Sequence, residues 1–355
     1  MQAEFSKWAV VSFKDDTGLG RMATEVRAAL GVGRHLVVPS ERLPGSSPTG
    51  AGESWLKPEA PVEAVAELVK DLEAVLVLER SDWHPKLFEV CRRQGVKILA
   101  VPMWEWFRGQ DEIWKLVDLF LCTSRFTEKI LRSYGYRNTA FIGPWPMDLA
   151  RFPQRHIKGP ARVFIHNAGL VDHDDRKGTR DVIQAFMRVR RRDIKLIVRL
   201  QKEVHLPPVD DRVTISVGNL ANPGDLYAEG DAAIQPSKME GLGLMILEPL
   251  CAGLPVITTD YPPMNEYVRQ PEMLVRKRWF RRTCFPARAA GIRHAHLRLP
   301  CLKDLARKIE WCAQNDLASI SRRNRLWAEG NFAGERVRAS WMRCAAGDAF
   351  PEGSV

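Results

Sequence analysis

Two glutamates flank a glycine-rich segment in the second half of the chain. Glu240 is followed by Gly241-Leu242-Gly243, and Glu248 lies a little over two helical turns further on. Glycines allow a ligand to approach the backbone, and the free amides at a helix N-terminus attract anions. A carboxylate can accept hydrogen bonds from two hydroxyl groups, which suits a sugar or a ribose diol. The segment therefore predicts a site for an anionic ligand that is rich in hydroxyl groups.

A second group of charged residues lies earlier, between an expected strand and an expected helix. Arg176 and Lys177 stand at the start of this helix. Two cations beside helix amides would neutralise a diphosphate leaving group. Asp172, Asp174 and Asp175 precede them and could suggest a metal, but we interpret these carboxylates as solvated loop residues. We expect the chemistry to need no metal.

Alternating strands and helices are expected to position these residues in two α/β domains. A proline-rich break at residues 143–160 separates two such runs, and a helical pattern extends from Leu317 to Cys344. We predict an N-terminal Rossmann-like domain over residues 1–150 and a C-terminal Rossmann-like domain over residues 151–325. Residues 326–355 are expected to form a C-terminal helix and tail that could pack back on the N-terminal domain.

The segment around Glu240 resembles the signature of the retaining GT-B glycosyltransferases of the large Glu-x7-Glu group (glycosyl transferases group 1, family 4-like). In that group the motif follows a strand that ends in Pro-Ser and precedes an Ala-Gly-x-Pro-Val turn. Here these parts are Pro236-Ser237, Glu240 to Glu248, and Ala252-Gly253-Leu254-Pro255-Val256. The resemblance implies an α/β GT-B fold, in which two facing Rossmann-like domains enclose an interdomain cleft and helices complete the C-terminus.

The resemblance also implies roles for the charged residues. Glu248 would bind the ribose of a nucleotide, and Glu240 would hold the transferred sugar together with the amides of Gly241, Leu242 and Gly243. Lys177 and Arg176 would stabilise the departing diphosphate. The family usually places its arginine earlier, directly after the strand, where this sequence has Asn167-Ala168-Gly169.

In the first half of the chain, the candidate residues are identified by their positions after expected strands more than by a sequence motif. In the family, glycines of the first loop often approach the donor phosphate, and Gly18 and Gly20 match that loop. His84 follows an expected strand and would lie at the carboxyl edge of the sheet, where it could contact the sugar or serve as a structural histidine. His166 ends the first strand of the second half and could face the cleft.

The resemblance implies transfer of a sugar from a nucleotide-diphosphate donor to an acceptor hydroxyl with retention of configuration, without a cofactor or metal. The acceptor stays open. A polysaccharide or glycolipid intermediate is favoured, and modified bases of DNA are the alternative. A non-catalytic nucleotide-sugar or nucleic-acid binding protein is a third reading, which the combination of Glu240, Glu248 and Lys177 disfavours.

The formal net charge of +10 favours anionic partners. We interpret Arg190-Arg191-Arg192 as a solvated face. In contrast, Arg276 to Arg282 interleaves aromatics with cations, which suggests contact with an anionic membrane or with nucleic acid. His294 and His296 lie in a basic, tail-like region that we expect to be solvated.

The seven cysteines show no paired metal-type spacing, which fits a reducing cytoplasm. The first residues lack a signal-peptide pattern, and no apolar run is long enough to span a bilayer. We therefore expect a cytoplasmic protein, with a peripheral position at the inner membrane face as the alternative.

Overall fold

The computed structural model describes residues 5–40, 47–171, 174–220 and 222–346. The chain divides into two compact units: unit 1 comprises Met1–Met147 and Gly334–Val355, and unit 2 comprises Asp148–Ala333. Within the described ranges, no helix is both long and apolar enough to cross a membrane.

Unit 1 is built on a seven-stranded parallel sheet with the strand order β3-β2-β1-β4-β5-β6-β7. The first strand lies inside the sheet and the chain continues from it in both directions, so the crossover helices cover both faces, as in a doubly wound fold. The strands are β1 (Trp8–Ser12), β2 (Arg34–Val37), β3 (Glu53–Trp55), β4 (Ala74–Glu79), β5 (Lys97–Pro102), β6 (Leu119–Cys122) and β7 (Thr139–Phe141). The helices are α1 (Gly18–Leu30), α2 (Val62–Val69), α3 (Leu87–Arg93), the short 3₁₀ helix η1 (Glu112–Leu116), α4 (Arg125–Ser133) and α11 (Gly334–Ala346).

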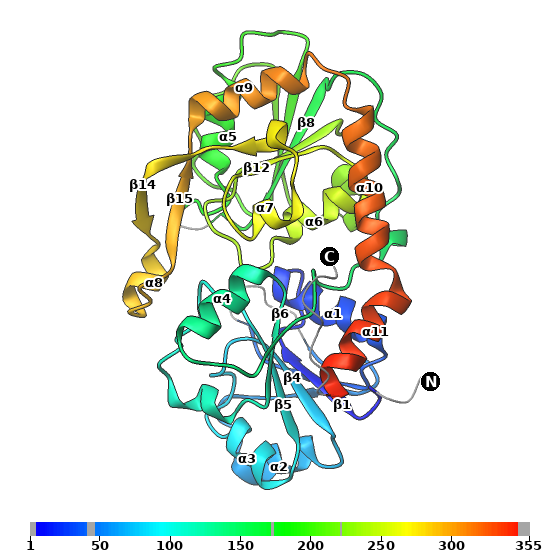
Figure 1. Cartoon of the computed structure of the whole chain (residues 1–355), viewed down its shortest axis with the longest axis vertical. Coiled ribbons are helices and arrows are strands. Elements are labelled where there is room, and N and C mark those ends of the chain that lie inside the picture. The colour runs from blue at the N-terminus through cyan, green and yellow to red at the C-terminus, as the bar shows by residue number, and fades with distance from the viewer. Residues whose placement is uncertain (1–4, 41–46, 172–173, 221, 347–355) are drawn as a thin grey trace. The chain divides into compact units, whose positions relative to one another are not determined.

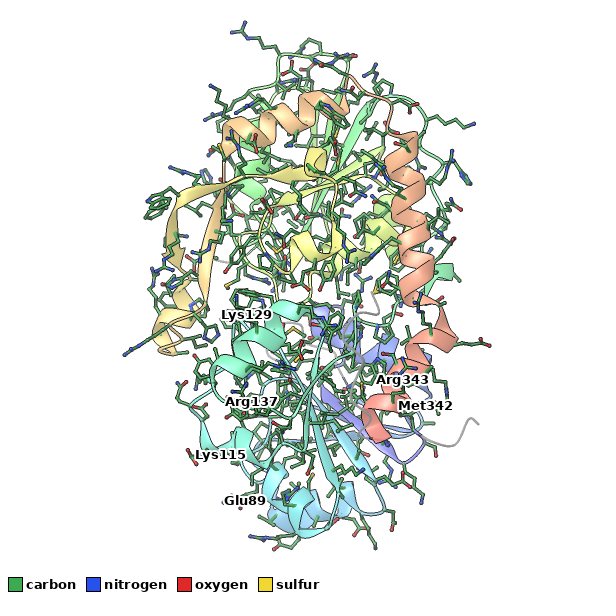
Figure 2. All side chains as sticks on the ribbon, in the orientation of Figure 1. Glu89, Lys115, Lys129, Arg137, Met342 and Arg343 are labelled. Atoms are coloured by element: carbon green, nitrogen blue, oxygen red, sulfur yellow. The ribbon has the colours of Figure 1, made fainter. Side chains whose placement is uncertain are left out.

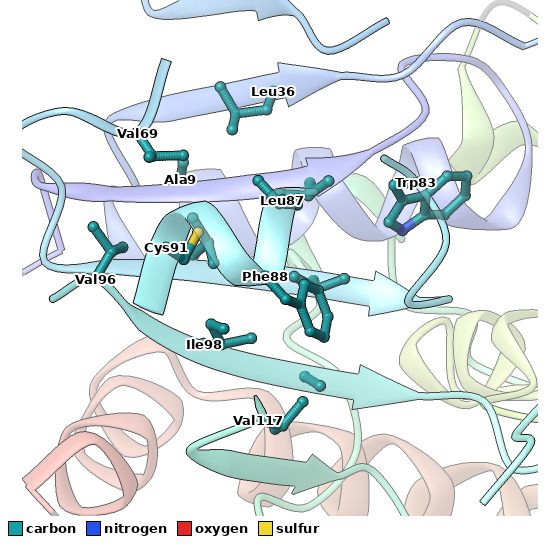
Figure 3. Close-up of a cluster of buried hydrophobic side chains, with 14 of the residues drawn as sticks. Ala9, Leu36, Val69, Trp83, Leu87, Phe88, Cys91, Val96, Ile98 and Val117 are labelled. Atoms are coloured by element: carbon teal, nitrogen blue, oxygen red, sulfur yellow. The ribbon is translucent and has the colours of Figure 1, made fainter. Parts of the chain in front are cut away.

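The core of unit 1 forms where helix α3 lies across the sheet (Figure 3). Leu87, Phe88 and Cys91 point from one side of the helix toward strand residues such as Ala9 and Ile98, and all five are essentially inaccessible. The strands read as nearly continuous apolar runs because both faces of a parallel sheet are covered. This burial is the main source of stability of the unit.

The outer faces of the helices carry charge. Lys86 and Glu89 pair one turn apart at 3.1 Å at the start of α3, and Glu112 and Lys115 pair in the same way at 2.7 Å in η1 (Figure 2). Exposed pairs of this spacing contribute only about 0.2–0.5 kcal/mol each. Their main effect is to keep these faces in water.

The last described helix, α11, packs on unit 1. Trp341 is buried against the edge of Trp145, with 5.5 Å between ring centroids, and Trp145 donates a hydrogen bond to the Met22 carbonyl at 3.0 Å. Arg338 donates to the Leu30 carbonyl at 3.0 Å. The helical pattern that the sequence shows from Leu317 to Cys344 is thus two helices.

Unit 2 contains a six-stranded parallel sheet with the order β10-β9-β8-β11-β12-β13 (Figure 1). The strands are β8 (Val163–Gly169), β9 (Lys195–Leu200), β10 (Val213–Val217), β11 (Ala232–Gln235), β12 (Val256–Thr259) and β13 (Leu274–Val275). The helices are η2 (Leu149–Arg151), α5 (Thr179–Phe186), η3 (Pro223–Tyr227), α6 (Leu244–Cys251), α7 (Met264–Tyr267), η4 (Pro271–Met273), α9 (Leu302–Cys312) and α10 (Ala318–Phe332). The α/β expectation of two parallel sheets is confirmed.

A two-stranded arm extends from unit 2 between β13 and α9 (Figure 1). It consists of β14 (Lys277–Thr283), α8 (Phe285–Ala289) and β15 (His296–Pro300), with the two strands antiparallel. The expectation of a solvated, tail-like region around His294 and His296 is wrong. The residues beside His296 in β15 are fully buried, and His296 is hydrogen-bonded to Thr283 at 2.8 Å.

The first turn of α1 depends on close packing at Gly20. A Cβ atom there would lie 2.1 Å from the Asp15 carbonyl oxygen and 2.5 Å from its nitrogen. We expect Gly20→Ala to destabilise unit 1 by about 1–3 kcal/mol, since the opposing atoms are backbone. Gly334→Ala is the matched control, because a Cβ there meets nothing within 4 Å. Denaturant unfolding of both variants checks this; equal stability would show that the loop at Asp15 relaxes freely.

Candidate functional site

The loops that follow β8 and β11 meet at the carboxyl ends of neighbouring parallel strands. The Lys238 amide donates a hydrogen bond to the Arg176 carbonyl at 2.8 Å. Gly178 has a φ of 73°, and a Cβ atom on it would lie 2.8 Å from the Pro236 carbonyl oxygen. Only glycine fits such a conformation and approach readily, so this residue allows the two loops to pack backbone to backbone.

Three sequence-predicted residues meet where these loops join. Glu240 accepts hydrogen bonds from Lys177 at 2.7 Å and from Arg176 at 3.0 Å, one on each carboxylate oxygen. Arg176 also donates to the Met239 carbonyl at 2.9 Å. The Glu240 side chain is only 4% exposed, whereas those of Arg176 and Lys177 are 21% and 16% exposed. The carboxylate is therefore held inside while the two cations retain contact with solvent.

The charge balance of this cluster fixes the protonation of Glu240. Desolvation by burial raises its pKa, but Lys177 and Arg176 outweigh it and lower the pKa from 4.5 to about 2. The glutamate is thus ionised at any pH at which the protein works. One carboxylate and two cations leave the cluster with a single net positive charge.

This cluster predicts a pH dependence of stability. A folded-state pKa below the unfolded value stabilises the native state above pH 4.5, and this stabilisation is lost as the pH falls toward 2. We expect Glu240→Gln to be less stable than wild type at neutral pH, and the difference to shrink by up to about 3 kcal/mol at low pH. Urea unfolding across a pH series measures it.

Glu310→Gln, on the exposed side of α9, is the control for this experiment. A difference between wild type and Glu240→Gln that stays constant with pH would contradict the ion-paired assignment.

A second, largely buried network of charged residues holds the loop that carries Arg176 and Lys177. Lys238, almost inaccessible, bonds to Asp175 at 3.2 Å and pairs with Asp181 at 3.0 Å. The Asp175 carboxylate also accepts the Thr179 and Arg180 amides at 2.9 and 3.2 Å, which caps the start of α5. Burial raises the pKa of Asp181, and Lys238 opposes that rise. Lys238 was not predicted as a site residue, although its neighbours in the Pro-Ser segment were recognised.

Asp174 and Asp175 are each 4% exposed, so interpreting them as solvated loop residues is wrong. Asp174 accepts a hydrogen bond from Arg282 of β14 at 2.8 Å and another from the Phe285 amide. Asp172 lies outside the described residues. Among those that are described, no cluster of three or more histidine, cysteine or acidic side chains could hold a metal ion.

Glu248 projects from α6 and is completely buried. One of its oxygens accepts a hydrogen bond of 2.6 Å from the hydroxyl of Tyr227, itself 1% exposed, at the end of η3. No local pattern points to Tyr227 as a site residue, because the contact joins segments 21 residues apart. The tyrosine fixes the rotamer of the carboxylate and thereby its orientation.

Helix α6 begins at the glycine-rich segment. Gly243 has a φ of 84° and precedes Leu244, the first residue of the helix, while Gly241 and Leu242 are buried beside it. A left-handed glycine lets the loop turn sharply and aim its amides at the sheet edge. The sequence pattern predicts a helix from Leu244 to Cys251, and α6 has the same bounds.

Buried polar atoms gather at the same sheet edge. Asn167 Oδ1, Gln235 Oε1 and Thr259 Oγ1 end three adjacent strands, and none has a hydrogen-bond partner among the described residues. Each such atom is costly unless something polar satisfies it. Their placement is the one expected where a parallel sheet binds a polar ligand.

The structure places Gly18 and Gly20 in unit 1, in the first turn of α1. Gly18 is exposed and Gly20 is buried against Asp15. Close packing within the unit is therefore sufficient to account for a glycine at position 20. The approach of Gly18 to a donor phosphate stays a prediction.

His84 also belongs to unit 1 and is 1% exposed. Its Nε2 donates to the Ala60 carbonyl at 3.0 Å, and its Nδ1 accepts the Lys86 amide at 3.1 Å. Both ring nitrogens are occupied, which favours the structural alternative. Two surface depressions of about 420 and 440 Å³ also lie in unit 1, around Trp55 and around Trp114, and neither includes a candidate site residue.

His166 is fully buried in unit 2. It bridges the Ile234 carbonyl at 2.7 Å and the Thr179 hydroxyl at 3.0 Å, tying β8 to β11 and to α5. Burial lowers its pKa from 6.5 to about 4, so the ring is neutral. It supports the site and has no free nitrogen for a ligand.

With this geometry established, comparison with known proteins identifies the fold. Residues 162–279 match the family model described as "Glycosyl transferases group 1", and this range contains Arg176, Lys177, Glu240 and Glu248. No curated protein matches the sequence.

Solved structures of similar fold cover nearly the whole chain. HepE from Anabaena, solved in a complex with UDP and glucose, matches with a TM-score of 0.71 and 13% identity over 96% of this chain and 99% of its own. A glycosyltransferase from Rickettsia africae matches with a TM-score of 0.67 and 14% identity over 95% and 96%. The lipopolysaccharide outer core galactosyltransferase WaaB matches with a TM-score of 0.64 and 12% identity over 96% and 99%. The chain thus has the GT-B fold, as the resemblance implied.

Proposed function

We propose that this protein is a retaining glycosyltransferase that uses a nucleotide-diphosphate sugar as its donor. The observation that carries this proposal is the buried Glu240 held between Lys177 and Arg176, beside the start of α6. The group 1 family match over the same residues supports a glycosyltransferase. We assign donor binding to residues of unit 2.

The net positive charge of the cluster suits the diphosphate of such a donor. Arg176 and Lys177 keep solvent contact while their partner carboxylate is buried. As the bond to the sugar breaks, negative charge grows on the departing phosphate oxygen. Cations already fixed in place stabilise that charge without reorganisation.

Glu240 and Glu248 would bind the hydroxyl groups at the two ends of the donor. Glu240 is ionised and can accept hydrogen bonds from the sugar, while the amides at Gly241 to Gly243 contribute donors. Glu248, oriented by Tyr227, would accept the ribose hydroxyls. The unsatisfied oxygens at the ends of β8, β11 and β12 add polar groups to the same edge.

Retention follows if the acceptor attacks from the face that the diphosphate leaves. The bond between the anomeric carbon and the phosphate oxygen breaks first, with an oxocarbenium-like sugar between the two. The acceptor oxygen then bonds to the anomeric carbon, and its proton passes to the departing phosphate oxygen. No protein nucleophile, cofactor or metal is needed in this sequence.

For the acceptor we favour a polysaccharide or glycolipid intermediate. WaaB is a lipopolysaccharide outer core galactosyltransferase, and the first half of this chain shares its fold. We therefore rank a glycan or lipid-linked sugar above modified DNA as the acceptor.

A donor-hydrolysis screen tests the proposal. The protein is incubated with UDP-, GDP-, ADP- and TDP-sugars, with and without EDTA, and nucleotide release is measured. We expect release from one donor to survive EDTA, and Lys177→Met to lower kcat roughly a hundredfold to a thousandfold. Lys303→Met, an exposed lysine at the start of α9, is the matched control.

Release that requires a metal would contradict the metal-independent chemistry. If no donor is hydrolysed, calorimetry with nucleoside diphosphates decides whether the site binds a donor at all, and absence of binding would refute the assignment. Once an acceptor is found, NMR of the product reports the anomeric configuration, and inversion would refute retention.

Tyr227 provides a separate prediction on the ribose end. Tyr227→Phe removes the 2.6 Å hydrogen bond to Glu248 without changing the shape of the ring. A hydrogen bond to a charged group is worth about 1.5–3 kcal/mol, so we expect KM for the donor to rise roughly tenfold or more. Because ribose does not react, kcat should change little. Tyr261→Phe, in the same unit, is the control, and a fall in kcat alone would argue against a binding role.

A further inference from the structure

The arm of unit 2 carries the most exposed aromatic surface of the described chain. Trp279 is completely exposed, Phe280 is 55% exposed and Phe285 is 57% exposed. The first two lie in β14 and the third begins α8. Isolated exposed apolar residues are common, but three large aromatics on one short projecting element mark a contact surface.

The backbone of the arm presents these side chains outward. Lys277 pairs with Pro300 and Arg281 with Arg298, so three residues of β14 lie opposite a single residue of β15. Such a bulge re-aims side chains and increases the local twist. Trp279 and Phe280 lie within it, which explains how two adjacent apolar residues both reach solvent.

The same segment is unusually basic. Residues 276–300 contain eight arginines and lysines and no aspartate or glutamate, against a net charge of +10 for the whole chain. Nitrogen-tipped side chains project along both strands of the arm (Figure 2). Arg282 pairs with Asp174 near the end of β14 that leads into α8, and Arg281 and Arg288 are exposed.

The composition of the arm indicates which anionic partner it fits. Apart from its cations, two histidines and Thr283, residues 276–300 are apolar, with no serine, asparagine or glutamine. Bases are read by amide and hydroxyl side chains as well as by cations. A bilayer surface instead needs cations for its phosphates and aromatic rings at headgroup depth. Charge and apolar exposure together therefore match an anionic lipid surface.

We propose that the arm β14–α8–β15 docks unit 2 on a membrane that contains anionic lipid. Trp279, Phe280 and Phe285 enter the headgroup region, and Arg281 and Arg288 lie against the phosphates. The arm touches the candidate donor site directly. Arg282 and the Phe285 amide hold Asp174, and the Arg298 amide donates to the Lys238 carbonyl at 2.8 Å. Docking thus brings the site loops to the lipid surface.

Sedimentation with vesicles tests the proposal on the full chain. Vesicles of phosphatidylcholine alone are compared with vesicles that also contain phosphatidylglycerol, across a salt series. We expect wild type to bind only the anionic vesicles. Trp279→Ser with Phe280→Ser should weaken binding roughly tenfold or more, through lost burial of apolar area. Arg281→Gln with Arg288→Gln should weaken it by about fivefold per cation at low salt and less at high salt.

Matched controls come from α10 of the same unit. Leu326→Ser removes an exposed apolar side chain, and Arg322→Gln with Arg323→Gln removes two exposed cations; neither should change binding. Circular dichroism and donor hydrolysis confirm that each arm variant remains folded. Failure of wild type to bind anionic vesicles, or equal binding by arm and control variants, would overturn the proposal. Binding of a DNA or RNA oligonucleotide through the arm, without vesicle binding, would also overturn the proposal and would identify nucleic acid as the partner of the arm.

Discussion

The candidate site depends on one electrostatic balance, between Glu240 and the pair Arg176 and Lys177. Burying the carboxylate alone would be costly, and two charge-assisted hydrogen bonds offset that cost and keep it ionised. The same contacts restrain two long side chains that otherwise have much rotational freedom. In the proposed reaction, cations that are already positioned need little reorganisation when a diphosphate binds. Stability and chemistry are therefore linked through the same three residues.

This balance can form only because two loops from different strands lie in backbone contact. Gly178 admits the close approach to Pro236, and Lys238 holds Asp175 and Asp181 beneath the loop. Gly178, Lys238 and Asp175 are buried, Asp181 is partly buried, and their contacts with one another account for their positions. They set the relative position of Glu240 and Lys177, which are 63 residues apart in the chain. The charged groups can be placed precisely because the residues that pack beside them are held rigidly.

The sequence predicted correctly those parts of the structure that have a local sequence pattern. Continuous apolar runs predicted most strands of both sheets, and the glycine turn before Leu244 predicted the start of α6 correctly. The residues it missed act over distance: Tyr227 meets Glu248 only in the folded chain, and Asp174 looked solvated because its partner Arg282 is 108 residues away. The arm was misjudged for a related reason. Strand β14 is mostly charged, and its antiparallel pairing with β15 joins segments that are separate in the sequence. This pairing, which accompanies the burial of Leu297 beside His296, could not be predicted from the local pattern.

The distribution of charge connects the arm to the site. Most of the basic excess is gathered in a segment without carboxylates of its own, and one buried acidic partner of this segment, Asp174, comes from the loop that carries Arg176 and Lys177. That aspartate has to be held by the arm for the loop to keep its path past Lys238. Asp174 is already desolvated, and Arg282, although its side chain is 43% exposed, is paired with it. Docking through Arg281 and Arg288 would leave this pair in place. Docking and integrity of the candidate donor site can then coexist, because separate arginines of the arm perform the two tasks.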